Sequence, residues 1–363
     1  MEKEIILVKY SEIGIKSRPV RKKMEDLLIK RLKEKIDTNA KKTSGRIILY
    51  PRQRISEEML EYLALTPGVK AIAKAIETRL DIEEMKSIAR RIVQERNAQS
   101  VAVRANRLDK NLGFKSIDIN KAVGEELAKI TRINLDNPEM EIFIDIDKKN
   151  AYIYTESIKG IGGLPVGSSG KAIALISGGI DSPIASILAL KRGLEVAALH
   201  LKLSDIEERR VKETIEKIKR IYPGIRLVIY EYKPILESIS KELRKKGMEK
   251  YMCIICKRTM IRIATSIANR EGIRVIIMGN NLAQVASQTL NNLESIHNAT
   301  DLLILEPLIG MDKEEIIDIA KRMGTFPERS LPKCAYAPRR PATRSDIVLI
   351  ERLEKEIFNN KEF

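Results

Sequence analysis

From Lys171 onward, apolar strand-like runs alternate with helical stretches, and this alternation restricts the fold of the chain more than any other feature. KAIALIS (171–177) precedes a helical stretch that closes at Gly193, and LEVAALHLKL, RLVIYEY and RVIIMG are each followed by another helical stretch. Strands that alternate with helices of this length favour a parallel, doubly wound sheet. Ligands bind such sheets at the carboxyl ends of the strands. Residues 171–363 are therefore predicted to form an α/β domain with a ligand site at that edge.

An almost uncharged glycine-rich stretch, GIGGLPVGSSG at 160–170, precedes this domain. Its composition predicts a linker, which we place at 163–170. Before it, the pattern predicts two α+β modules, residues 1–55 and 56–162. Their expected elements are strands at 4–10, 46–51, 69–78 and 101–105, helices from about Pro19, from Ser56, from Asp81 to about Arg96 and after Ser116, and a hairpin of EIFIDID and AYIYTES. Asp81 with Glu84 indicates a capping box, and a last helix is expected at about 345–358.

The charge balance points to a polyanionic partner. The chain has 66 basic and 50 acidic residues, a net charge of +16, and residues 1–50 hold 14 Lys or Arg against 7 Asp or Glu. This excess favours nucleic acid, although a thermophile-like solvated surface is the alternative. The absence of Trp and the presence of only five Phe argue against an aromatic platform that stacks many bases, and backbone and shape recognition of folded RNA fits better.

The sequence also limits where the protein acts. No stretch approaches the roughly 18 consecutive apolar residues that span a membrane, and the start MEKEIILVKY lacks the basic segment of a secretory signal. We therefore expect a cytoplasmic protein without membrane association. Three cysteines, Cys253, Cys256 and Cys334, are too few for a disulfide framework, and their uneven spacing suggests chemistry.

The first strand of the carboxyl-terminal domain leads into Ser177-Gly178-Gly179-Ile180-Asp181-Ser182. Adjacent glycines allow a tight turn with bare N–H groups, and the following helix adds its positive end, so the segment suits a pyrophosphate. Asp181 would repel phosphate unless a divalent cation lies between them, which assigns it to Mg²⁺. The alternative is an ordinary strand-to-helix turn. Neither a Walker loop nor the GxGxxG fingerprint is present.

This motif resembles the PP-loop of ATP pyrophosphatases, which cleave ATP between the α and β phosphates to adenylate a substrate. GLPVGSSGKAIALISGGIDSPIAS, GNNLAQVASQTLNNLESI, PLIGMDKEEIIDIAKRMGTF and VKYSEIGIKS are similar to stretches of tRNA 4-thiouridine synthetases, with Ser11 where that family usually has glycine. The resemblance implies a ferredoxin-like module, a THUMP domain that recognises the acceptor end of tRNA, and a PP-loop domain. It also implies 4-thiouridine formation at tRNA position 8, and it is compatible with a homodimer.

The resemblance further implies which residues bind ATP. Ser177, Gly178, Gly179 and Ser182 would hold the pyrophosphate. Lys257 and Arg258 lie where the family has a basic ATP contact, although a solvated helix face is the alternative. His200 as a catalytic base competes with a structural histidine. Gly279 ends RVIIMG, where a side chain would block the nucleotide. The remaining implied positions are Leu175, Ile176, His200 and Leu201, whose backbone groups would contact adenosine, and Gln288 on the next helix.

The implied reaction has two stages. Transfer of AMP to uracil O4 turns a poor leaving group into a good one, and pyrophosphate departs toward the glycine loop and Mg²⁺. A thiolate, persulfide or hydrosulfide then attacks C4, and AMP leaves. The sulfur donor would be inorganic sulfide or the persulfide of a cysteine desulfurase.

The sequence ends at Phe363 without the rhodanese domain of many bacterial relatives, so sulfur handling is expected to fall to the PP-loop domain. Cys334 matches the family's cysteine there. Cys253, Cys256 and Cys334 resemble the three ligands of iron–sulfur sites in other tRNA thiolases, with one iron left open. A catalytic disulfide or persulfide and plain structural cysteines are the alternatives. The alternatives for the whole chain are another adenylating PP-loop enzyme that modifies tRNA and a non-catalytic tRNA-binding protein.

Overall fold

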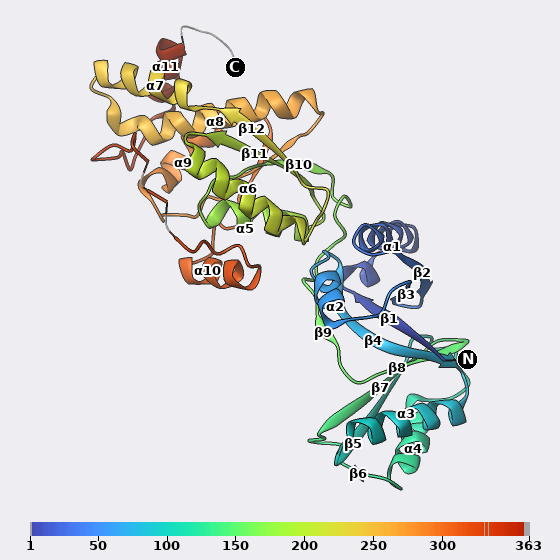
Figure 1. The fold of residues 1–363 in the computed structure, drawn as a ribbon. Helices are drawn as coiled ribbons and strands as arrows, with labels where there is room; N and C mark the ends of the chain where they lie inside the picture. The colour runs from blue at the N-terminus through green and yellow to red at the C-terminus, as the bar shows by residue number, and fades with distance from the viewer. Residues whose placement is uncertain (1, 330, 333, 359–363) are drawn as a thin grey trace. The chain divides into compact units, whose positions relative to one another are not determined.

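The computed structural model describes residues 2–329, 331–332 and 334–358 and divides into two compact units between Val166 and Gly167 (Figure 1). This division falls within the predicted linker. No helix in the described ranges has both the length and the apolar character needed to cross a membrane.

The amino-terminal unit is an α+β structure. Its strands are β1 (Lys3–Tyr10), β2 (Thr38–Thr43), β3 (Arg46–Pro51), β4 (Val69–Arg79), β5 (Ser100–Arg107), β6 (Arg132–Ile133), β7 (Met140–Ile146), β8 (Asn150–Tyr154) and β9 (Ile158–Lys159). Its helices are α1 (Arg18–Lys33), α2 (Glu57–Ala64), α3 (Ile82–Arg96) and α4 (Ser116–Leu127), with a 3₁₀ turn η1 at Glu12–Ile15.

In the described residues these strands form one nine-stranded sheet of order β2-β3-β1-β4-β8-β7-β5-β6, with β9 paired to β4. β4 joins the two predicted modules, because it pairs with β1 on one side and with β8 and β9 on the other. The ferredoxin-like and THUMP segments therefore share a single sheet.

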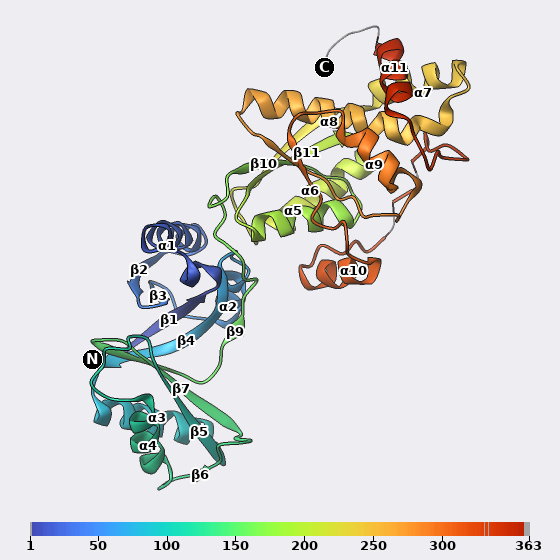
Figure 2. The ribbon, with the colours of Figure 1, turned by 180° about the vertical axis from the view of Figure 1, so that it is seen from behind.

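All four helices cover one face of this sheet (Figures 1 and 2). Alternation along β1 sends Ile6 and Val8 into the cluster under α1 and α2, and Ile5 and Leu7 to the opposite face. Equivalent alternation in β7 and β8 fills the core beneath α3 and α4.

In the described residues no helix covers the opposite face, where side chains of β2 and β3 bond to β7 and to the turn that follows it. Arg46 Nε of β3 donates to Asp145 Oδ2 of β7 at 2.8 Å, and the hydroxyl of Thr43 donates to Asp147 Oδ2 at 2.7 Å. These bonds join residues about one hundred positions apart in sequence. The curved sheet thus buries its apolar centre, including Ile5, Leu7 and Tyr152, without a covering layer.

The carboxyl-terminal unit is the predicted doubly wound α/β domain. Its strands are β10 (Lys171–Leu175), β11 (Glu195–Lys202), β12 (Arg226–Glu231), β13 (Val275–Ile277) and β14 (Leu303–Leu305), all parallel in the order β12-β11-β10-β13-β14. Its helices are α5 (Asp181–Lys191), α6 (Asp205–Lys219), α7 (Lys233–Lys245), α8 (Met252–Arg270), α9 (Leu290–His297), α10 (Lys313–Arg322) and α11 (Ile347–Phe358), with 3₁₀ turns η2 (Glu249–Tyr251) and η3 (Ala286–Gln288). α5 and α6 lie on one face of the sheet, and α7 and α8 on the other (Figures 1 and 2).

Strand order in this unit reverses at β10, because β11 and β13 flank it. The loops that leave β10 and β13 therefore diverge to opposite faces and open a crevice, which is where parallel sheets bind ligands. Ile173 and Leu175 of β10 pack with Leu199 and Leu201 of β11 against α7 and α8, and this core fixes the strand ends that carry the loops.

Local sequence signals located most of these elements. Asp81 caps α3 by accepting from the amides of Glu83 and Glu84 at 2.8 and 3.0 Å. The predicted capping box is only half formed, because the Glu84 carboxylate accepts a hydrogen bond from Thr78 instead. Strand β2 was not predicted, since its sequence TNAKKT has no apolar alternation.

Candidate active site

The loop at residues 177–182 connects β10 to α5, and its two serines hold it together. The amide of Ser177 donates to Ser182 Oγ at 2.9 Å, the two serine hydroxyls lie 3.1 Å apart, and the Gly179 amide donates to Ser177 Oγ at 3.4 Å. Ile180 at the N-cap position of α5 provides no side-chain acceptor. The first amides of α5 therefore keep their hydrogen-bonding capacity for an anion.

A Cβ would meet neighbouring atoms at two glycines around this loop, a movable leucine side chain at Gly178 and fixed backbone at Gly279. A Cβ on Gly178 would lie 2.5 Å from Leu331 Cδ1, and one on Gly279 would lie 2.7 Å from the amide nitrogen of Ser182. The sequence analysis expected a side chain at Gly279 to block the nucleotide. In the structure, a side chain at Gly279 would first collide with the backbone at the start of α5.

Asp181 is the first residue of α5, and its carboxylate faces a cation. Lys313 Nζ lies 2.8 Å from Oδ1 and 3.1 Å from Oδ2 of Asp181, with side-chain exposures of 43% and 28% respectively. Lys313 opens α10, whose start is fixed by the reciprocal capping box of Asp312 and Glu315. Sequence reasoning missed Lys313, because the two charges are 132 positions apart.

The strand ends next to the loop contribute backbone. The amide of Ile176 donates to the carbonyl of Leu199 at 2.9 Å, and the side chain of Leu201 lies in the core. His200 is buried, with Nδ1 3.1 Å from the carbonyl oxygen of Ile176, while Nε2 has no partner among the described atoms. This geometry fits the structural alternative for His200 better than a general base, because the buried ring is tied to a backbone carbonyl.

Lys257 lies at the centre of a polar network below the crevice. Its Nζ donates to Asn280 Oδ1 at 2.8 Å, and Gln288 Nε2 donates to the same oxygen at 3.3 Å. Asn280 Nδ2 in turn donates to Glu306 Oε1 at 2.5 Å, and His297 Nε2 lies 3.0 Å from that oxygen.

Burial and hydrogen bonding shift the pKa values of two members of this network. Burial lowers the pKa of Lys257 from its ordinary value, although Cys253 and Glu306 act in the opposite direction. Burial by itself raises the pKa of Glu306, and the hydrogen bonds from His297 and Asn280 outweigh it, so that this pKa is lowered. The oxygen Oε1 of Gln288 has no partner among the described atoms. A buried cation and an unpaired amide oxygen are both groups that a polar ligand would satisfy.

Arg258 does not join this network. Its side chain is 0% exposed, donates to Glu354 Oε2 of α11 at 2.7 Å, and also donates to the carbonyl of Ser295. The expectation that Arg258 contacts ATP is therefore corrected. Its guanidinium ties α8 to α9 and α11, and the neighbouring Lys257 alone turns toward the site.

The cysteines come from two segments. Cys253 and Cys256 lie half-buried near the start of α8, and Cys334 is exposed in the loop before α11, all three as free thiols. Tyr232 Oη donates to the carbonyl of Cys256 at 3.0 Å and lies 3.6 Å from its sulfur.

The thiols of α8 are held in their protonated form. Burial, aided by neighbouring Cys253 and Cys334, raises the pKa of Cys256 to about 12, and burial also raises the pKa of Cys253. Among the described residues, no three Cys, His, Asp or Glu side chains form a group that could hold a metal ion. The predicted three-cysteine iron–sulfur arrangement is thus not formed by these side chains as they stand.

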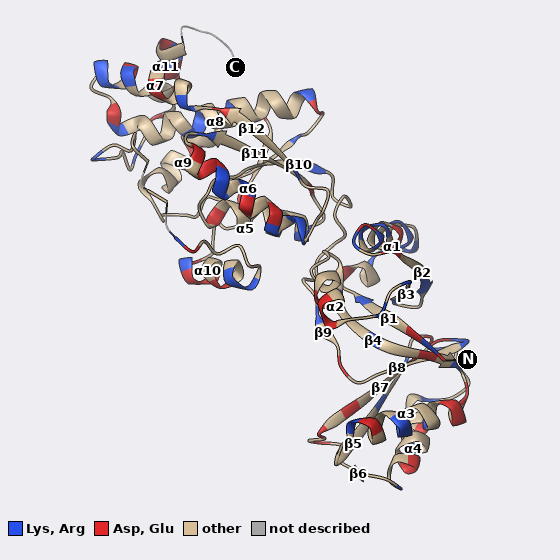
Figure 3. Cartoon of the chain, viewed as in Figure 1, with Lys and Arg blue, Asp and Glu red and all other residues tan. Residues whose placement is uncertain are grey.

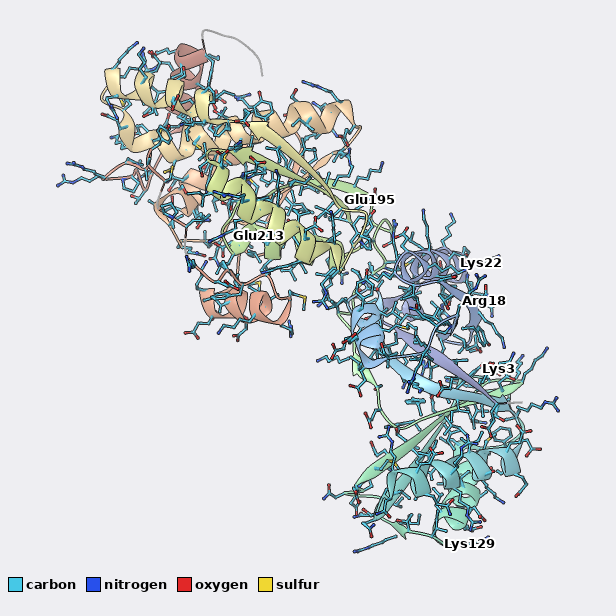
Figure 4. All side chains as sticks on the ribbon, in the orientation of Figure 1. Lys3, Arg18, Lys22, Lys129, Glu195 and Glu213 are labelled. Atoms are coloured by element: carbon cyan, nitrogen blue, oxygen red, sulfur yellow. The ribbon has the colours of Figure 1, made fainter. Side chains whose placement is uncertain are left out.

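Helix α1 presents a basic face in the amino-terminal unit (Figure 3). Arg18 and Lys22 extend from it into solvent (Figure 4), as do Lys23, Lys30 and Lys33. A row of exposed cations on one helix suits the phosphate backbone of a nucleic acid.

Comparisons with known proteins cover the whole chain. Residues 167–358 match the family described as thiamine biosynthesis protein (ThiI), residues 79–156 match the THUMP domain, and residues 5–73 match the ThiI ferredoxin-like domain. The chain is 36% identical to a probable tRNA sulfurtransferase of Methanocaldococcus jannaschii, covering 97% of both chains, and 33% identical to that of Thermococcus kodakarensis, covering 98% of both.

Two solved structures are similar over most of their length. A 4-thiouridine synthetase in complex with RNA and ATP superimposes with a TM-score of 0.85 at 30% identity, covering 98% of both chains. PH1313 from Pyrococcus horikoshii superimposes with a TM-score of 0.69 at 25% identity, covering 89% of this chain and 100% of that one.

Proposed function

We infer that this chain, which belongs to the thiamine biosynthesis protein (ThiI) family, is a tRNA sulfurtransferase that uses ATP to convert a tRNA uridine into 4-thiouridine. The observation that carries the proposal is the uncapped start of α5, set in the serine-held loop at the strand crevice with Asp181 and Lys313 beside it. Full-length relatives named tRNA sulfurtransferases and the ATP-bound 4-thiouridine synthetase support it.

ATP would bind with its phosphates at this loop. The free amides of α5 would hold the β and γ phosphates, and backbone groups at Leu175, Ile176, His200 and Leu201 would line the adenosine. Lys257 faces Asn280 and Gln288, and we assign its ammonium to the phosphate that becomes AMP. A positive charge fixed at that point stabilises the pentavalent transition state at the α phosphorus more than it stabilises bound ATP. This difference accelerates the transfer.

Asp181 and Lys313 would act at the leaving group. The carboxylate already pairs with a cation, and a carboxylate with adjacent phosphate oxygens is a common Mg²⁺ environment. Bound Mg²⁺ would neutralise charge that develops on the departing pyrophosphate. Lys313 would then be released from Asp181 to contact the same phosphates.

The amino-terminal unit would bind the tRNA. We propose that residues 56–162 act as the THUMP domain and that residues 1–55 support it, with the basic face of α1 contributing phosphate contacts. The shared sheet supports a joint role, because the two segments cannot move independently while β4 pairs with strands of both. Such an enzyme would act in the cytoplasm, where tRNA and ATP are found.

Sulfur transfer would depend on the three cysteines. Cys334 is exposed and can receive sulfur from a donor, whereas protonated Cys253 and Cys256 are shielded. We derive no step through an iron–sulfur cluster, because the described side chains form no metal group. Cluster ligation by Cys253, Cys256 and Cys334 stays a prediction, tested by iron and acid-labile sulfide in anaerobically purified protein.

The proposal is tested with ATP, Mg²⁺, sulfide and unmodified tRNA. We expect AMP and pyrophosphate in equal amounts, together with 4-thiouridine on nucleoside analysis of the tRNA. Release of ADP and phosphate would contradict the adenylation chemistry. AMP formation that leaves a different modified nucleoside would instead indicate another tRNA-modifying reaction on the same fold.

A further inference from the structure

A large groove is lined by residues next to the cysteines in sequence and shares no lining residue with the loop at 177–182. Its volume is about 1210 Å³, and its lining comes from the second half of α7, from Gly247–Met252 and from Ala335–Arg340. Cys253 directly follows the second of these segments, and Cys334 directly precedes the third. Neither cysteine lines the groove itself, but the residue next to each of them does.

The groove is strongly basic. Six cations line it against the carboxylates of Glu237 and Glu249, and basic residues are visible at the end of α7 in Figure 3. The six are Lys241, Arg244, Lys245, Lys250, Arg339 and Arg340. Among the residues that the structure describes, only Lys245 of these six is in an ion pair, with Glu242 at 2.6 Å. The other five cations leave their charge available to a ligand.

Both walls of the groove are held in place by the fold. Tyr336 donates a hydrogen bond to Glu237 Oε1 of α7 at 3.2 Å, and the amide of Ala342 donates to the carbonyl of Lys250 at 2.9 Å. The amide of Ala337 closes a turn onto the carbonyl of Cys334 at 3.1 Å. The basic side chains are thus arranged on a fixed frame beside Cys334.

We propose that this groove binds the RNA strand that carries the target uridine, holding its phosphates so that the base reaches the cysteines. The inference rests on the proposed function, because that reaction brings a uridine to sulfur-bearing residues. The amino-terminal unit would provide the general grip on tRNA, and the groove would position the segment to be modified.

The lining favours RNA over a protein sulfur donor. Protein interfaces are depleted of charged residues at their centre and need an apolar core, whereas nucleic-acid interfaces are polar and strongly positive. Apart from Leu243, Met252, Pro338, Gly247 and two alanines, the lining is charged or polar. Tyr336 adds a ring at the wall that an unstacked base could contact.

Charge reversal in the full-length protein tests the proposal. Arg244→Glu and Arg340→Glu change exposed side chains of the groove, and Lys217→Glu makes the same change on the exposed face of α6. We expect each groove variant to raise the KM for tRNA about tenfold. The slope of the logarithm of the tRNA binding constant against the logarithm of the salt concentration should become shallower by about one. ATP affinity without tRNA should match the wild type, which shows that the fold is intact, and the Lys217 variant should match the wild type throughout.

Three results would overturn the inference. If the wild type thiolates tRNA and both groove variants equal the Lys217 control, the groove does not bind RNA, while the proposed function stands. If the groove variants lose activity with a protein persulfide donor but keep it with inorganic sulfide, the groove binds an acidic protein. If the wild type forms neither AMP nor 4-thiouridine, the proposed function fails and this inference fails with it.

Discussion

The open face of the amino-terminal sheet and the strand-end crevice of the carboxyl-terminal sheet differ in whether their polar groups have partners. In the amino-terminal unit, Arg46 pairs with Asp145 and Thr43 with Asp147, so that polar side chains of distant strands satisfy one another. In the carboxyl-terminal unit, His200 Nε2 and Gln288 Oε1 have no partner among the described atoms, and α5 begins without a cap. The first arrangement stabilises a surface, and the second leaves groups that a ligand can satisfy. This difference distinguishes the open face of the amino-terminal sheet from the candidate active site.

Asp181→Ala should produce the largest effect. Without this carboxylate, Mg²⁺ would lose the ligand that we assign to it, and the negative charge on the departing pyrophosphate would no longer be neutralised. We expect AMP and 4-thiouridine formation to fall by at least about 10³-fold. Affinity for tRNA, which we assign to the amino-terminal unit and to the groove beside the cysteines, should stay within about twofold. Quenched-flow measurement of AMP and filter binding of tRNA check both. Asp318→Ala, an exposed change on α10, is the matched control, and equal loss of tRNA binding in Asp181→Ala would break the division of roles.

Arg46→Ala should destabilise the amino-terminal unit. It removes the cation that pairs with Asp145, whose side chain is 3% exposed and keeps the hydrogen bond from Asn106 Nδ2. Loss of one partner of a buried ion pair typically costs about 3–5 kcal/mol. Arg91→Ala removes an exposed arginine that pairs with Glu2. It should lower the free energy of unfolding by about 0–1 kcal/mol. Urea unfolding followed in each variant gives the two free energies. If Arg46→Ala weakens the free energy of ATP binding by as much as it lowers the free energy of unfolding, the two units are not independent.

Gly279→Ala should disturb the reaction site by a smaller amount. The added methyl group meets the backbone at Ser182, and overpacking of this kind costs about 1–3 kcal/mol. We expect ATP affinity to fall by about tenfold, measured by calorimetry. Gly310→Ala adds a methyl group where nothing lies within 4 Å and should bind ATP as the wild type does. Unchanged affinity in Gly279→Ala would mean that the start of α5 does not hold the phosphates.

The pH dependence of ATP binding should show the smallest effect. Burial lowers the pKa of Lys257, so its ammonium is lost at a lower pH than that of an ordinary lysine. Because the charged form binds phosphate, ATP affinity should fall as pH rises through this lowered pKa. Lys257→Arg keeps its charge over the whole range and should remove that fall. A fall that persists in Lys257→Arg would assign the titration to another group.

Sequence patterns found the parts of the site that are contiguous. The loop at 177–182 could be identified because its glycines, serines and Asp181 lie within six positions between a strand and a helix. The same reasoning assigned both Lys257 and Arg258 to an ATP contact, because adjacent residues belong to the same local sequence pattern. A helix turns by about 100° per residue, and in α8 this rotation sends Lys257 to Asn280 and Arg258 to Glu354. No local pattern carries that distinction.

By itself the sequence determined the parallel fold of the carboxyl-terminal unit and the family to which the chain belongs, and it located the loop at 177–182 as the candidate phosphate site, because these depend on residue types at short spacing. Tertiary structure alone decided that Lys313 faces Asp181, that Asn280 joins Lys257 to Glu306, and that the amino-terminal sheet closes through Arg46 and Asp145. Each of these contacts joins residues between 23 and 132 positions apart. Which of many charged side chains meet at such separations is set by how strands and helices pack, and that packing is a property of the whole folded chain.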